Sequence, residues 1–268
     1  MFMDDIEYNR QMEYDMMMDE LLSMGADIDE YQKTNSEIIE ETMKDVVIAK
    51  IPKNKTRMFP ITTDEKNMQD KKCDYQLLFI LTLLSRYSKD ENHRYIFKDD
   101  IVINKELIEK YSKRKINTII KNIRKLSKLE GNAVIGKIVN DKIVYIINYE
   151  NEQGRKYVLL EETLMKYLVD TSSSNLIKIY LLLRYRCNDK NEKKITRKSL
   201  AEGIGLNSNS GENLMTITNI IKDLKAKNLI EVNKKFKTTQ LNDGNFKHSE
   251  SNYIKLINYD DWLKWYKK

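Results

Sequence analysis

Apolar residues in the second half of the chain recur at helical spacing in three successive segments. The first segment is 175–187, and it follows a hydroxyl cluster at 171–173 that can cap a helix. A short second helix is predicted from Thr196 to Gly205, a glycine suited to the left-handed residue that ends many helices. The third segment is 213–227, and its apolar arc contains Leu214, Ile217, Ile220, Ile221 and Leu224.

Strand-like residues follow the third predicted helix. The runs 229–232 and 253–257 are rich in aliphatic residues, and we expect them to pair as two strands joined by a Lys-rich loop with an Asn-Asp-Gly tip. Within the helical part, Ala201 and Gly205 suit a tight crossing of the second and third helices. A Cβ at such a contact would clash or force an unfavourable φ.

The first half of the chain repeats this order of elements. Helices are predicted at 74–87, 104–111 and 112–129, followed by a hairpin with an Asn140–Asp141 turn. Three helices and a hairpin are the order of a winged helix. The predicted fold class is therefore α+β and helix-rich, with two winged-helix domains (helix-turn-helix plus β-hairpin wing) in tandem.

The predicted domain limits follow from composition and from the two repeats. Residues 1–45 form an acidic, Met-rich segment, residues 46–155 the first winged helix, and residues 156–268 a connector and the second winged helix. The connector, 156–168, has the pattern of a short strand and a helix and contains no flexible linker sequence, so we expect the two domains to pack together.

Charge is distributed unevenly along the chain. Residues 1–45 carry 14 Asp and Glu against 3 Lys and Arg, whereas residues 46–268 carry 44 Lys and Arg against 27 Asp and Glu, a net charge of +17. Both halves of this basic body share the excess. A body of this charge attracts polyanions, so double-stranded DNA is the first expected partner.

The first domain places its cations on the third predicted helix. Seven Lys and Arg and no acid lie between Lys113 and Lys128, without the alternating charge that ordinary solvated helices use. We therefore expect this helix to contact phosphates or to enter a groove. The candidate DNA-contacting residues of this domain, including its hairpin, are Lys113, Arg114, Asn117, Thr118, Lys121, Arg124, Lys125, Lys128, Lys137 and Lys142.

In the second domain the third helix carries neutral polar side chains opposite its apolar arc. Asn pairs well with adenine in the major groove, although Asn and Thr also populate ordinary helix surfaces. The candidates for base contact are Asn213, Thr216, Asn219 and Lys222. The candidates for phosphate contact are Arg197 and Lys198 at the second helix and Lys234, Lys235, Lys237 and Lys247 in the wing.

The chain lacks the motifs of the common catalytic sites. It contains no Gly-rich loop of the G-x-x-x-x-G-K-[ST] type, and His93 and His248 have no partners at metal-ligand spacing. Its paired acids lie at element edges, where helix capping accounts for them. We therefore expect no catalytic residues, no metal and no cofactor, and thus no enzyme.

The cellular compartment is predicted from similar absences. Cys73 and Cys187 are far apart and form neither a disulfide framework nor a zinc pattern. No secretory leader is visible, and no apolar run reaches the ~20 residues of a membrane span. The expected location is the cytoplasm, with no membrane partner.

Residues 8–24 combine acids with Met16, Met17, Met18, Leu21 and Leu22. One interpretation is a disordered acidic tail. Another is a helix that folds on a protein partner, such as a host replication protein, because Met-rich surfaces adapt to varied partners. A third is a segment that lies back on the basic body and weakens nonspecific DNA binding.

The order of the elements, the connector "YVLLEETLMKYL" and the Ser-capped helix "SSSNLIKIYLLLRYR" resemble the tandem winged-helix initiators of plasmid replication, above all those of Gram-positive bacteria. The resemblance covers about residues 73–257. It implies two winged helices that grip repeats at an origin, third helices in major grooves, and exchange between monomer and homodimer. The long loop before Leu214 and the acidic N-terminal segment depart from the family pattern.

The function expected from these features is sequence-specific binding of double-stranded DNA, as a plasmid or phage-type replication initiator. A transcriptional regulator with the same fold is the first alternative. An adaptor that binds protein, with an incidental basic face, is the second.

Overall fold

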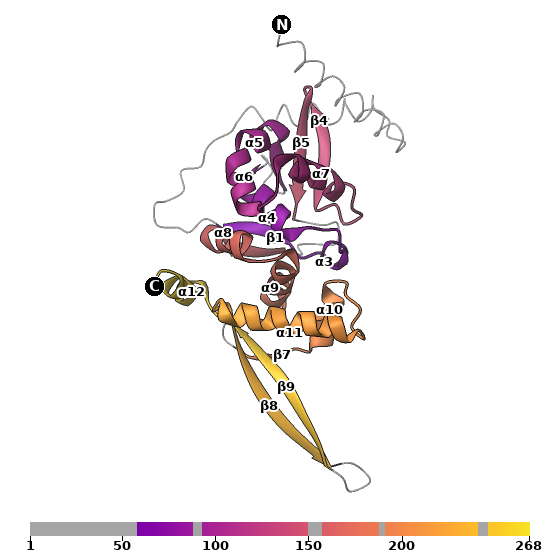
Figure 1. Cartoon of the computed structure of the whole chain (residues 1–268), viewed down its shortest axis with the longest axis vertical. Coiled ribbons are helices and arrows are strands. Elements are labelled where there is room, and N and C mark those ends of the chain that lie inside the picture. Colours follow the sequence, from indigo (N-terminus) through magenta and orange to yellow (C-terminus); the bar gives the residue numbers. More distant parts are fainter. Residues whose placement is uncertain (1–57, 88–92, 150–156, 188–190, 241–245) are drawn as a thin grey trace.

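The computed structural model describes residues 58–87, 93–149, 157–187, 191–240 and 246–268. The acidic segment 1–45, with its predicted partner-binding role, lies outside these residues. The described chain combines helices with three small antiparallel sheets, which confirms the α+β class. Figure 1 shows the chain as two successive layers of helices, with one hairpin extending from the second layer.

The first repeated unit begins with a buried helix and ends with a hairpin. Its elements are α4 (Tyr75–Leu84), β2 (Arg86–Tyr87), β3 (His93–Phe97), α5 (Lys98–Ile103), α6 (Lys105–Ser112), α7 (Ile116–Leu126), β4 (Val134–Val139) and β5 (Lys142–Asn148). The strand order in its sheet is β2-β3-β5-β4. Asn140 and Asp141 have φ values of 48° and 58°, as a two-residue hairpin turn requires, so the predicted turn is confirmed.

The second unit repeats the broader order of a helix, strand, helices and a closing hairpin, with one strand and two helices where the first unit has two strands and three helices. Its elements are α9 (Ser174–Arg186), β7 (Lys193–Lys194), α10 (Arg197–Gly203), α11 (Gly211–Ala226), β8 (Ile230–Gln240) and β9 (Phe246–Leu256). The strand order is β7-β9-β8, so in both units the last strand lies inside the sheet: β5 lies between β3 and β4, and β9 lies between β7 and β8. Ser173 and Thr196 cap α9 and α10 through their hydroxyl groups, as predicted.

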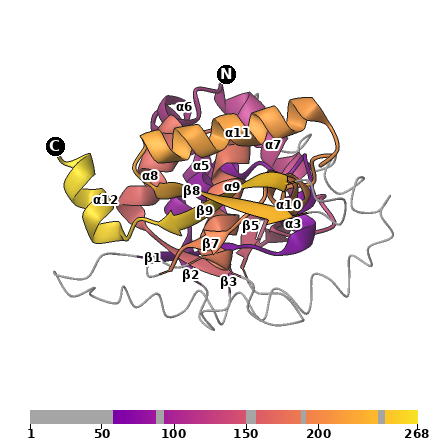
Figure 2. The same ribbon diagram turned by 90° about the horizontal axis from the view of Figure 1, so that it is seen from below.

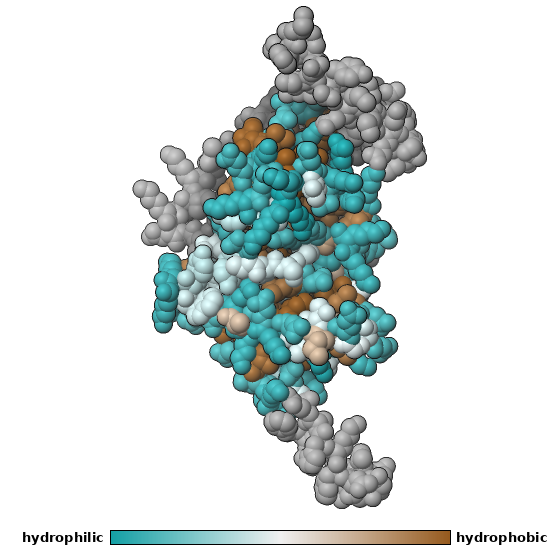
Figure 3. Space-filling model, in the orientation of Figure 1, coloured by the Kyte–Doolittle hydropathy of each residue, from teal (hydrophilic) through white to brown (hydrophobic). Residues whose placement is uncertain are grey.

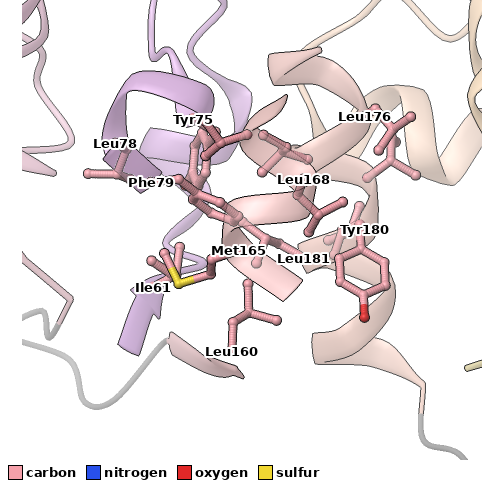
Figure 4. Packing of buried hydrophobic residues seen from close by; sticks show 14 of the residues in the cluster. Ile61, Tyr75, Leu78, Phe79, Leu160, Met165, Leu168, Leu176, Tyr180 and Leu181 are labelled. Atoms are coloured by element: carbon pink, nitrogen blue, oxygen red, sulfur yellow. The ribbon is translucent and has the colours of Figure 1, made fainter. Parts of the chain in front are cut away.

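Four further elements join the two units. They are β1 (Met58–Thr62), α3 (Glu65–Gln69), β6 (Tyr157–Glu161) and α8 (Glu162–Thr171), and α12 (Tyr259–Tyr266) follows the last strand. Strand β1 pairs with β6 across the predicted boundary at residue 155, with Phe59 opposite Leu160. The core is continuous across the same boundary, because Phe79 of α4, Met165 of α8 and Leu181 of α9 belong to one buried cluster (Figure 4).

Several predicted limits were wrong. The helix predicted at 74–87 ends at Leu84, and the helix predicted at 112–129 spans only 116–126. A left-handed residue, Lys113 (φ 57°), ends α6, and the Glu109 carboxylate then accepts the N–H of Ile116 at 2.8 Å at the start of α7. Helix α5 was not predicted.

The second hairpin is also longer than predicted. The segment expected to be a Lys-rich loop continues both strands, so eleven residue pairs align from Ile230–Leu256 to Gln240–Phe246. Strands β8 and β9 therefore extend about 35 Å at the usual rise of 3.3 Å per residue. Figure 1 shows this hairpin projecting beyond the body of the second unit.

Gly205, which lies just after α10, has a different neighbour from the one expected. Ala201 is fully buried, and Gly205 has φ 73°, as the predicted helix stop requires. However, a Cβ on Gly205 would lie 1.9 Å from the carbonyl oxygen of Gln69, in α3, one of the elements that join the two units. Gly205 thus permits contact of the second unit with α3. It is Gly203 that permits a close helix crossing, since a Cβ there would lie 2.4 Å from Leu182 of α9.

Candidate nucleic-acid interface

Helix α7 has one apolar face and one polar face. Ile119, Ile123 and Leu126 are buried, which confirms the predicted apolar arc. The exposed side chains of the helix include Asn117, Thr118, Lys121 and Lys125, and Arg124 is half-exposed beside them. The core contacts therefore hold a cationic face outward.

Two of the cations that precede α7 have partners within the protein. Arg114 forms an ion pair with Asp74, the residue that caps α4, and donates a second hydrogen bond to the side chain of Gln76 at 3.3 Å. The Lys113 ammonium donates to the carbonyl oxygen of Asp170 at 3.4 Å. The prediction that both residues lie on the third helix was wrong, because they form the turn that ties α7 to α4 and α8.

The first hairpin offers one exposed lysine and one half-buried lysine. Lys142 is exposed beside the Asn140–Asp141 turn, while Lys137 lies in the middle of β4, where burial lowers the pKa of its ammonium group. Lys128 is exposed just after α7. A phosphate close to the hairpin would therefore meet Lys142 first.

Helix α11 is oriented by Ile217, Ile220, Ile221 and Leu224, which are buried as predicted. Two of the four residues predicted to read bases use their polar groups within the protein. The Asn213 side-chain amide donates to the backbone carbonyl oxygen of Asn207 at 3.1 Å. The Thr216 hydroxyl donates to the backbone carbonyl oxygen of Glu212, also at 3.1 Å. Asn219 and Lys222 are exposed.

The first turn of α10 lies beside α11 and the preceding loop. Arg197 donates to the hydroxyl of Thr218 at 3.1 Å, and Lys198 donates to the side chain of Asn209 at 3.4 Å. Both cations remain exposed. They fix α10 against α11 and still present charge to solvent.

Midway along the second hairpin, Lys235 has an anchoring role. Its ammonium group is 2.7 Å from a Glu192 carboxylate oxygen and 4.3 Å from the centre of the Tyr253 ring. The hydrogen bond with Glu192 raises the pKa of Lys235, and the hydrogen bonds from Lys235 and Asn233 lower the pKa of Glu192. Lys234 is exposed, whereas the side chains of Lys237 and Lys247 lie outside the described part of the structure.

The described residues contain no group of three His, Cys, Asp or Glu side chains able to hold a metal ion. Cys73 is buried, and desolvation raises the pKa of its thiol to about 12, so it is a poor ligand and nucleophile near neutral pH. Within the same residues, no helix combines the length and apolar character needed to cross a bilayer.

One exposed residue was missed from the sequence. Met215 lies on the outer face of α11 with 58% of its surface exposed. Helical periodicity places Met215 opposite the apolar arc, but only polar residues were chosen there as candidates for DNA contact.

Helices α7 and α11 lie on the same side of the molecule, opposite the pair β1–β6 and strands β2 and β3 (Figures 1 and 2). The site is thus a surface with two outward helices and a hairpin beside each. Searches against family models, curated proteins and solved structures find no match to this chain.

Proposed function

We propose that this chain is a tandem winged-helix protein that binds double-stranded DNA in a sequence-specific manner. In support of the proposal, each unit has helices followed by an antiparallel hairpin. We take α7 and α11, the last helices before the hairpins, as the recognition helices, and β4–β5 and β8–β9 as the wings. The observation that carries the proposal is that α7 and α11 lie on the same side of the molecule and that each has exposed polar side chains. A single duplex can approach both helices from that side.

The two helices differ in chemistry, and we propose different tasks for them. Lys121, Arg124 and Lys125 on α7 suit phosphates, which supply affinity for any sequence. Asn219 on α11 suits base edges, which supply selectivity. Within this class, the resemblance of residues 73–257 to plasmid initiators makes a plasmid or phage-type replication initiator our first assignment, with repeats at an origin as its target. A transcriptional regulator would bind a promoter operator instead.

A second candidate, an adaptor that binds protein, is favoured by one specific surface. Val102 and Ile103 of α5 are 47% and 79% exposed, and Leu107 of α6 adds to them beside a pocket lined by Leu84 and Tyr111. Figure 3 shows apolar surface at α5 on the face that also carries α7. This function predicts only weak, sequence-independent binding of DNA.

The test is binding to duplex fragments from the protein's own replicon at several salt concentrations. We expect the wild-type chain to prefer one repeated site. The double variant Arg124→Ala/Lys125→Ala should bind all fragments more weakly. Its negative slope of log K against log salt should become shallower by about 1.8, or 0.9 for each lost phosphate contact. Lys267→Ala/Lys268→Ala is the matched control, because it removes the same charge just after α12.

The outcomes separate the candidates. A preferred site near an AT-rich origin supports the initiator, and a promoter site supports the regulator. If no fragment is preferred and both double variants behave like the wild-type chain, sequence-specific DNA binding is refuted and the adaptor takes its place.

A further inference from the structure

The outer face of α11 presents one stripe of exposed side chains. Met215, Asn219 and Lys222 are all exposed, and their i, i+4, i+7 spacing places them in a single row. Their neighbours Asn213 and Thr216 are only half-exposed and bond to backbone carbonyl groups. The side chains available to a ligand along this row are therefore a thioether, an amide and an ammonium group.

Met215 is the unusual member of the stripe. With 58% of its surface in solvent, it is not part of the core that holds α11, where Ile217 and Ile221 perform that task. On a helix that contacts DNA, an exposed apolar group has one complement among the base edges of the major groove, the C5 methyl group of thymine. Asn219, one turn further on, has the two-sided hydrogen-bonding group that matches N6 and N7 of adenine.

The dimensions of the stripe limit the site that it can read. Lys222 lies seven positions after Met215, which at 1.5 Å per residue is about 10 Å along the helix axis. Base pairs in a duplex are about 3.4 Å apart, so the row spans roughly three of them. Lys222, at the end of the row, can meet guanine or the adjoining phosphate.

We propose that α11 recognises a run of about three base pairs in which Met215 contacts a thymine methyl group and Asn219 contacts an adenine. This inference rests on the proposed function and specifies its target. The second unit then selects an A·T-containing element, while Asn213 and Thr216 shape the loop and the helix start without reading bases.

The test first selects the preferred site of the wild-type chain from a pool of random duplexes. Each thymine of that site is then replaced by uracil, which lacks only the methyl group, and each adenine by 7-deazaadenine, which lacks the N7 acceptor. We expect one uracil position to lower the wild-type affinity about fourfold, from the transfer free energy of one buried methyl group. One 7-deazaadenine position should lower it at least fivefold.

The variants assign each effect to a side chain. Met215→Ala should bind the thymine and uracil sites equally, and Asn219→Ala should bind the adenine and 7-deazaadenine sites equally. Thr216→Ala, a neighbour on the same helix, is the control and should keep both sensitivities. Circular dichroism melting of each variant confirms that it is folded.

The failures are distinguishable. If the wild-type protein binds its enriched site equally well with thymine or uracil, the role of Met215 is overturned. If Met215→Ala still distinguishes thymine from uracil, or Asn219→Ala still distinguishes adenine from 7-deazaadenine, the role of the substituted residue is overturned. In both cases the proposed DNA binding stands. A pool that yields no enriched sequence removes the proposed function and this inference together.

Discussion

The joint between the two units depends on Gly205, and Gly205→Ala tests this dependence. Gly205 has φ 73°, a backbone region that costs a residue with a Cβ roughly 1–2 kcal/mol. The new Cβ would also lie 1.9 Å from the carbonyl oxygen and 2.8 Å from the carbonyl carbon of Gln69. These are backbone atoms, so α3 or α10 must shift, which costs about 1–3 kcal/mol more. The expected loss of unfolding free energy is therefore roughly 2–5 kcal/mol.

The assay is urea unfolding followed by circular dichroism, with Gly211→Ala as the matched control. Gly211 begins α11, and a Cβ there would meet no atom within 4 Å. The control should therefore be neutral, or stabilising by up to about 1 kcal/mol. If Gly205→Ala loses less than about 0.5 kcal/mol, or matches Gly211→Ala, the reasoning about the contact with Gln69 is refuted.

Three further predictions concern the cap, the thiol and the hairpin. Asp74→Ala should destabilise the fold by about 1–3 kcal/mol in urea unfolding, because it removes both the cap of α4 and the ion pair with Arg114. Asp74→Asn should cost less, because Asn keeps the cap and loses only the ion pair. Equal losses in the two variants would contradict this. The folded-state pKa of Cys73 is raised to about 12, so its neutral thiol stabilises the fold fully below pH 9, and this contribution disappears as pH rises through 12. The stability advantage of wild-type protein over Cys73→Ala should therefore shrink above pH 9 in unfolding curves, and a constant difference would contradict the shift. Replacement of 236–250 by Asn-Gly joins Lys235 to Ser251, which face each other in the hairpin. The melting temperature should stay within a few degrees while DNA affinity and its salt slope fall, and unchanged DNA binding would exclude the outer hairpin from the interface.

The sequence predicted those parts of the fold that depend on local patterns. Ile119 and Ile123 in α7, and Ile217 and Leu224 in α11, are buried as their spacing required, because helical periodicity alone decides which side of a helix is apolar. Asn140 and Asp141 form the predicted turn for a similarly local reason.

Other features depend on contacts between residues that are distant in the sequence, so no local pattern could predict them. Seven cations between Lys113 and Lys128 predicted one continuous charged helix, yet Arg114 pairs with Asp74, forty residues earlier in the chain. The length of the second hairpin was missed because its outer strands are polar and Lys-rich, so that only the pairing of β8 with β9 shows them to be strands.

The sequence by itself determined the apolar faces of α7 and α11, the Asn140–Asp141 turn and the excess of positive charge in the body. The tertiary structure decided which of these charges are available and which residues join the two units. The physical reason is that residue type does not show what a side chain or backbone contacts. An exposed cation and a cation in an ion pair look the same in the sequence, and so do a glycine that packs against another backbone and one that does not. Lys121 and Arg114 illustrate the first case, and Gly211 and Gly205 illustrate the second.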